Sequence, residues 1–113
     1  MDNNMTNLVE RYRHGAIGMD DVSDSKKANK CHDEWHACYK ILRETEEGRG
    51  AIIGLMKDEK PGVRCGAAAH SLQWVPERAR HVLETLRDSH GPCSLEAEMI
   101  LKEYDKGRLT FDY

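Results

Sequence analysis

This sequence lacks the features that membrane proteins and nucleic-acid-binding proteins need. No apolar run approaches the roughly 20 residues that a membrane-spanning helix requires. The formal net charge is -3 at neutral pH, and lysine and arginine are spread along the chain, so the basic surface typical of a nucleic-acid-binding domain is missing. We therefore expect neither a membrane nor a nucleic acid as partner.

A leader sequence and a phosphate-binding loop are missing as well. Residues 1–15 contain no cationic stretch followed by an apolar one, so we expect no secretory signal and a cytoplasmic location. The glycines at 48 and 50 lack the spacing of nucleotide-binding loops and are interpreted as a helix break. The best candidate for a strand, residues 108–113, is too short to form a sheet.

The cysteines fit a reducing compartment. The chain has four of them, at Cys31, Cys38, Cys65 and Cys93, and they fall on three different predicted helices. Nothing else in the sequence indicates secretion, where cysteines usually form disulfides. We expect free thiols in or near the core.

What the sequence does contain is helical periodicity. Its 113 residues, 39% hydrophobic and 33% charged, suit a single domain over residues 1–113. Apolar residues recur at three- and four-residue steps, with Trp35 in the middle of the longest stripe. The predicted helices cover about 4–18, 26–47, 51–57, 63–74, 76–87 and 94–106.

The most informative stretch, 60–86, is predicted to form two helices that fold back on each other at a Val-Pro corner. Pro61 and Pro76 suit the first turns of these helices, where a missing N–H costs nothing. Small residues such as Ala67 and Ala68 allow a neighbouring helix to come close. Together the helices predict an all-α fold, a stack of about six antiparallel helices.

Residues 26–107 resemble a family of small bacterial proteins with a HEAT-like helical fold, the domain-of-unknown-function family numbered two thousand and nineteen. The blocks that carry the resemblance are KKANKCHDEWHACYKILRE (26–44), EGRGAIIGLM (47–56), PGVRCGAAAHSLQWVPERARHVLETL (61–86) and GPCSLEAEMILKEYDKG (91–107). The resemblance implies a HEAT-like stack and supplies no catalytic residues and no cofactor. Some relatives look like immunity proteins encoded beside secreted toxins.

One group of cysteines and histidines suggests a metal site. His32 and His36 are four residues apart, so both can reach one metal ion from the same helical face. Cys31 and Cys38 point in other directions, because each residue turns a helix by about 100°. We expect core cysteines beside surface histidines, with no metal bound; a Cys/His metal-binding protein remains an alternative.

A second group suggests a thiol nucleophile with a histidine base. Cys65 or Cys93 would be the nucleophile, and His70 or His81 the base. Cys93 is the better candidate because it lies at the start of a predicted helix, where the dipole favours the thiolate. No oxyanion motif surrounds it, so we expect no catalytic residues and no enzyme.

Arg64 follows the first valine of its predicted helix. A half-buried guanidinium needs a partner, and Asp58 or Glu59 is close enough in sequence to supply one. We expect this contact to be structural.

Acidic and aromatic side chains are the candidates for binding a protein partner. Trp and Tyr supply much of the energy of protein interfaces, and Tyr12, Tyr39 and Tyr113 are expected to keep exposed edges. Trp74, near a helix end, is expected to remain partly exposed. The predicted contact residues are Asp20, Asp21, Tyr39, Glu44, Glu46, Glu47 and Trp74.

These observations predict a non-enzymatic protein-binding module. Its most concrete form is an immunity-type protein that neutralises a bacterial toxin by direct binding, with acidic groups facing a basic nuclease. The alternative is a structural or regulatory helical module that acts as a homodimer or adaptor. Strong salt dependence of binding would favour the first hypothesis.

Overall fold

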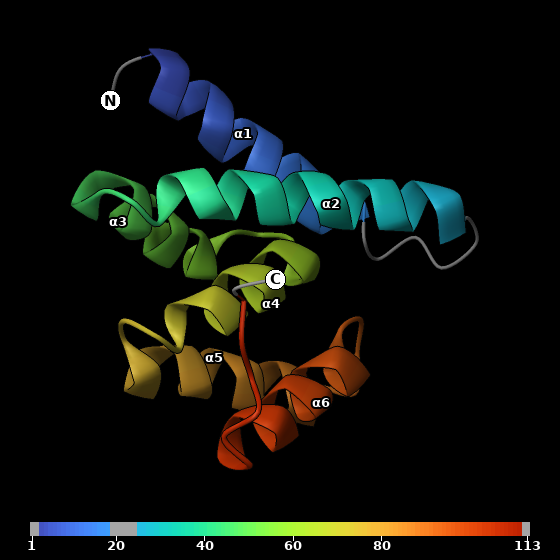
Figure 1. Cartoon of the computed structure of the whole chain (residues 1–113). Coiled ribbons are helices and arrows are strands. Elements are labelled where there is room, and N and C mark those ends of the chain that lie inside the picture. The colour runs from blue at the N-terminus through green and yellow to red at the C-terminus, as the bar shows by residue number, and fades with distance from the viewer. Residues whose placement is uncertain (1–2, 19–24, 112–113) are drawn as a thin grey trace.

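The computed structural model describes residues 3–18 and 25–111 of the chain. Every regular element in this part of the chain is helical, which confirms the all-α prediction (Figure 1). The elements are α1 (Asn3–Gly18), α2 (Ser25–Leu42), α3 (Glu46–Gly54), the 3-10 turn η1 (Leu55–Lys57), α4 (Pro61–Ser71), α5 (Pro76–Asp88) and α6 (Ser94–Asp105).

Helices that follow one another in sequence also pack against one another. α1 packs mainly on α2, and α5 packs on both α4 and α6. After α6 the chain turns back past α5 toward α4, as Figure 1 shows. Phe111 in this returning segment is buried.

The centre of the molecule is α4. All of its residues except Pro61 and Arg64 are buried, and Val63, Ala67 and Ala68 are completely so. Proline occupies the first turn of α4 and of α5, as the Val-Pro corner predicted. The small side chains of α4 let helices approach it from several sides.

The boundary between the second and third helices differs from the prediction. The predicted helix over 26–47 ends at Leu42, and α3 begins at Glu46 rather than at residue 51. Thr45 caps α3, since its hydroxyl accepts a 3.0 Å hydrogen bond from the backbone N–H of Gly48. A threonine followed by two glutamates is a helix-start signal, so the glycines interpreted as a break lie inside α3.

Gly48 is required by the close approach of α3 to the end of α2. A Cβ atom at this position would lie 2.0 Å from the carbonyl oxygen of Leu42. Backbone atoms cannot move away as the tip of a side chain can. Glycine therefore serves here to bring two helices together, although it lowers helix propensity.

The two ends of α6 are formed in different ways. Cys93 occupies the cap position before Ser94, with a left-handed φ of 69°. The Ser94 hydroxyl donates a 2.7 Å hydrogen bond to the carbonyl oxygen of Arg87 at the end of α5. At the other end Gly107, with φ 70°, ends the helix as predicted, and Arg108 N–H bonds the carbonyl of Glu103 at 2.9 Å, as in a Schellman motif.

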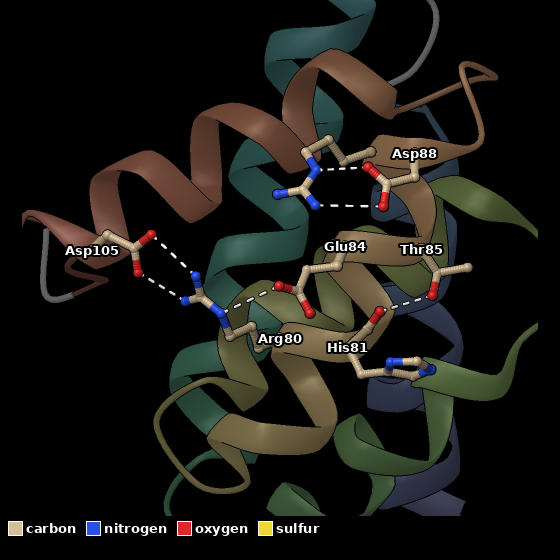
Figure 2. Close-up of polar contacts among 7 residues, drawn as sticks. Arg80, His81, Glu84, Thr85, Asp88 and Asp105 are labelled. Atoms are coloured by element: carbon tan, nitrogen blue, oxygen red, sulfur yellow. Dashed lines mark hydrogen bonds and ion pairs between the residues drawn. The ribbon is translucent and has the colours of Figure 1, made fainter.

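Charged side chains tie α5 to α6 on the surface. Figure 2 shows Arg80 between two carboxylates, with both oxygens of Asp105 at 2.8 and 3.1 Å and Glu84 at 3.5 Å. The carboxylate of Asp105 has its pKa lowered, mainly by the hydrogen bond from Arg80. Because the pair is solvent-exposed, water and salt screen it, and its contribution to stability is small.

We expect Gly48→Ala to lower the free energy of unfolding by at least about 2 kcal/mol, because the new methyl group meets backbone that must shift. Gly50→Ala is the matched control in the same helix, since a Cβ there meets nothing within 4 Å. That change should raise stability by about 0.5–1 kcal/mol through helix propensity. Urea unfolding of both variants measures the difference; equal effects would contradict the close approach.

Candidate functional site

The exposed candidate residues gather at the corner between α2 and α3. We call this the acidic corner and define it by Ile41, Glu44, Glu46 and Glu47. All four are exposed, and Ile41 stands out because 54% of its surface is accessible. The corner thus combines one large apolar side chain with three carboxylates, as sequence reasoning anticipated for the glutamates but not for Ile41.

Two arginines moderate the charge of the acidic corner. Arg43 lies 3.7 Å from Glu44 and 5.2 Å from the centre of the Tyr39 ring. Arg49 donates a 2.7 Å hydrogen bond to the carbonyl oxygen of Arg43. These contacts hold the turn between the helices in place, and the net local charge is less acidic than the glutamates alone suggest.

The prediction that Tyr39 lies on the surface is wrong. Its side chain is completely buried, as is that of Tyr12. The physical reason is stacking, because the Tyr39 ring lies 3.8 Å from that of His70 and nearly parallel to it, at 8°. The Tyr39 hydroxyl is satisfied by Gln73, which donates to it at 2.9 Å, so neither its ring nor its polar end is free for a partner.

Trp74 is half-buried, as expected, but it does not belong to the acidic corner. The centre of its ring lies 6.3 Å from the centre of the Tyr39 ring. Tyr39 is on the buried side of α2, whereas Ile41 is on the exposed side. Asp20, Asp21 and Tyr113, the remaining predicted residues, lie outside the described part of the chain.

The cysteines are free thiols, of which Cys31, Cys38 and Cys65 are buried and Cys93 is partly so. Burial raises the pKa of the Cys38 thiol, which disfavours the reactive thiolate. The expected surface position of His36 is wrong, because this side chain is buried.

The rings of His32 and His36 stack 6.2 Å apart. Among residues 3–18 and 25–111, no group of three or more His, Cys, Asp or Glu side chains could hold a metal ion. This finding leaves the two-histidine motif without a third ligand in that part of the chain.

Arg64 contacts the expected residues through different atoms. It donates to the backbone carbonyl oxygens of Asp58 and Glu59 at 2.9 and 3.1 Å. The carboxylate of Asp58 instead receives two hydrogen bonds from Arg13 of α1, at 2.7 and 3.1 Å. The Arg13 hydrogen bond lowers the pKa of Asp58 and ties α1 to the turn before α4.

His70, considered as a general base in the sequence, is the centre of the aromatic core. Trp35 and Tyr39 stack on its ring at 4.2 and 3.8 Å. Phe111 meets it edge-on at 4.5 Å. The Tyr12 hydroxyl lies 2.7 Å from Nδ1, and the enclosure leaves no path by which a substrate could reach the imidazole.

The enclosure also fixes the charge of His70. Burial, followed by the charges of His36, His32 and Arg43, lowers the pKa of His70 well below its ordinary value. The buried Nε2 atom has no hydrogen-bond partner within the described residues. The imidazole is therefore neutral and acts as a packed aromatic ring.

Comparison with known proteins adds no relative. A scan against protein-family models finds no match for the chain, and comparisons with curated proteins and solved structures find none either. Within the described ranges, no helix combines the length and the apolar character needed to cross a bilayer.

We expect acid to destabilise the fold through His70. The unfolded chain takes up a proton at an ordinary pKa of about 6.5, whereas the folded chain resists it. Stability is therefore fully present above about pH 6.5. It falls by up to about 1.4 kcal/mol per pH unit as the pH drops from there toward the folded pKa. Urea unfolding between pH 7.5 and 5, values chosen to bracket about 6.5, measures this slope.

The variant His70→Gln should be less stable at neutral pH, because it loses the ring stack. Its free energy of unfolding should also depend less steeply on pH below about 6.5, the ordinary pKa of histidine in the unfolded chain. His14→Gln, an exposed position on α1, is the control and should keep the wild-type slope. The assignment fails if His70→Gln keeps it too.

Proposed function

We propose that this chain is a non-enzymatic protein-binding module of the immunity type, which neutralises a toxin by direct binding in the cytoplasm. The observation that supports this proposal best is the exposed Ile41 among the glutamates of the acidic corner. An apolar anchor with a charged rim is the usual composition of a protein interface. The burial of the reactive groups, His70 and Cys65 among them, fits a protein without chemistry of its own.

The chemistry of the corner selects the kind of partner. Carboxylates at a rim attract a basic protein and speed its encounter, while a single apolar side chain can fill a pocket on the other surface. A basic nuclease has such a surface where it binds nucleic acid. The proposed HEAT-like arrangement of the helices, and the family resemblance of residues 26–107, agree with this function and are part of the same proposal.

A second candidate function, a helical module that forms homodimers, is favoured by one observation on α6. Leu95 and Met99 are four residues apart on one face of the helix, and 68% and 58% of their surfaces are exposed. Two apolar side chains at this spacing could pack against the same pair of a second copy. The two candidates use different surfaces and can therefore be separated.

Light scattering distinguishes the two candidates. The chain is measured alone and mixed with the product of its adjacent gene. Immunity function predicts a monomer that forms a tight complex and silences a toxic activity. The opposite result is a homodimer that dissociates in the Leu95→Ala/Met99→Ala variant and forms no complex with the neighbouring gene product. That result would overturn the immunity proposal in favour of the helical module.

The acidic corner should determine the affinity of the complex. We expect Ile41→Ala to weaken binding about tenfold, as truncation of an interface anchor does. Neutralising Glu44, Glu46 and Glu47 to glutamine should weaken it by a similar factor, mainly at low salt. Calorimetric titration measures both effects. Glu98→Gln on α6 is the control, and unfolding curves check that the loss of Glu46 and Glu47 has not melted the start of α3.

A further inference from the structure

The proposed function does not use a pocket at the other end of α2. It has a volume of about 380 Å³ and opens between the end of α1, the N-terminal half of α2, α4, α6 and the returning C-terminal segment. Pockets that bind small molecules have volumes of roughly 300–1,000 Å³ and mostly apolar walls. The pocket therefore has the size and character of a small-molecule site.

Small residues of α4 create this space. Gly62, Gly66 and Ala69 line the pocket where a larger side chain would fill it. The Trp35 indole lies against Gly66, so that a Cβ atom on this glycine would be only 3.1 Å from the indole nitrogen. Because Trp35 also stacks on His70, its ring is held in place and the wall it forms exists before any ligand arrives.

Aromatic rings form the apolar walls. Trp35, Phe111 and His32 all line the pocket, and the His32 and Trp35 rings lie 5.5 Å apart. Flat faces of this kind bind flat rings by stacking and by edge contacts. A saturated chain would use them less well.

The polar groups of the pocket are few and mostly unused. The indole N–H of Trp35 is buried beside Gly66 within the wall, so it is not exposed to the pocket. In the same described ranges, the side chains of Glu96 and Asn29, which also line the pocket, form no hydrogen bond or ion pair. The pocket thus offers a carboxylate and an amide to a ligand.

The charges exclude one large class of ligand. None of the described residues that line the pocket is a lysine or an arginine, and Glu96 is negative. A phosphate group would find no cation and would be repelled by this carboxylate. An anionic nucleotide is therefore a poor fit, whereas an uncharged ring with an exocyclic amino group can donate to Glu96.

We propose that this pocket binds an uncharged, amino-substituted nitrogen heteroaromatic ring, such as a purine base without its phosphate. The ring packs between the aromatic walls, and its amino group donates to Glu96 and Asn29. Each of these polar groups then gains the partner that it lacks in the empty pocket.

The test is a titration of the full chain with adenine, followed by amide shifts in NMR spectra and by calorimetry. Hypoxanthine, in which a carbonyl replaces the amino group, and adenosine monophosphate, which adds a phosphate, are the comparison probes. We expect adenine to bind about threefold to fivefold more tightly than hypoxanthine, the size of an exposed charge-assisted contact, and the monophosphate to bind most weakly.

Two variants locate the binding. Ala28→Leu places a larger side chain at a half-buried lining position and should abolish adenine binding. Glu96→Gln should remove the preference for adenine over hypoxanthine. Glu98→Gln, on the same helix but outside the pocket, is the matched control and should behave as wild type.

Three results would overturn the proposal. The first is that adenine produces no saturable change up to its solubility limit, and the second is that the monophosphate binds more tightly than adenine. The third is that Ala28→Leu leaves binding unchanged while the variant remains folded in its NMR spectrum. If Ala28→Leu unfolds, Glu96→Gln decides alone, since that residue is exposed; an unchanged preference for adenine then rejects the proposed contact.

Discussion

The fold depends on the enclosure of one neutral imidazole by aromatic rings from three other parts of the chain. His70 of α4 meets Tyr12 of α1, Trp35 and Tyr39 of α2 and Phe111 after α6. Each aromatic contact adds directional packing to the burial of apolar surface, and the Tyr12 hydroxyl satisfies one imidazole nitrogen. A chain with few aromatic residues has thus gathered most of them around one histidine, and this places α1, α2 and the C-terminal segment around α4.

Local signals in the sequence were sufficient to predict much of the helical order. Pro61 and Pro76 mark helix starts, and Gly107 marks an end, because each acts through its own backbone geometry. The start of α3 was missed because the low helix propensity of Gly48 was weighed without its tertiary contact. Only the approach of the Leu42 carbonyl, which depends on how two helices cross, explains why glycine is needed inside a helix there.

The candidate site was harder to predict because exposure depends on the rotation of a helix and on its neighbours. Tyr39 and Ile41 are two residues apart, yet one is completely buried and the other is 54% exposed. Because aromatic residues are common in protein interfaces, Tyr39 was predicted as a contact residue, although Ile41 is the exposed member of this pair. The glutamates of the acidic corner were identifiable from charge alone, whereas the pocket beside Trp35 requires five segments to come together and leaves no local pattern.

The two proposed surfaces share α2 but can be tested separately. Ala28 and Ile41 are 13 residues apart in sequence, which corresponds to about 20 Å along a helix. Substitutions more than about 10 Å apart with no common partner usually have additive effects. The packed core between them, with Trp35 and Tyr39 on opposite parts of the His70 stack, is shared by both surfaces. A change at His70 would therefore disturb both, whereas changes at Ala28 and Ile41 should each affect one.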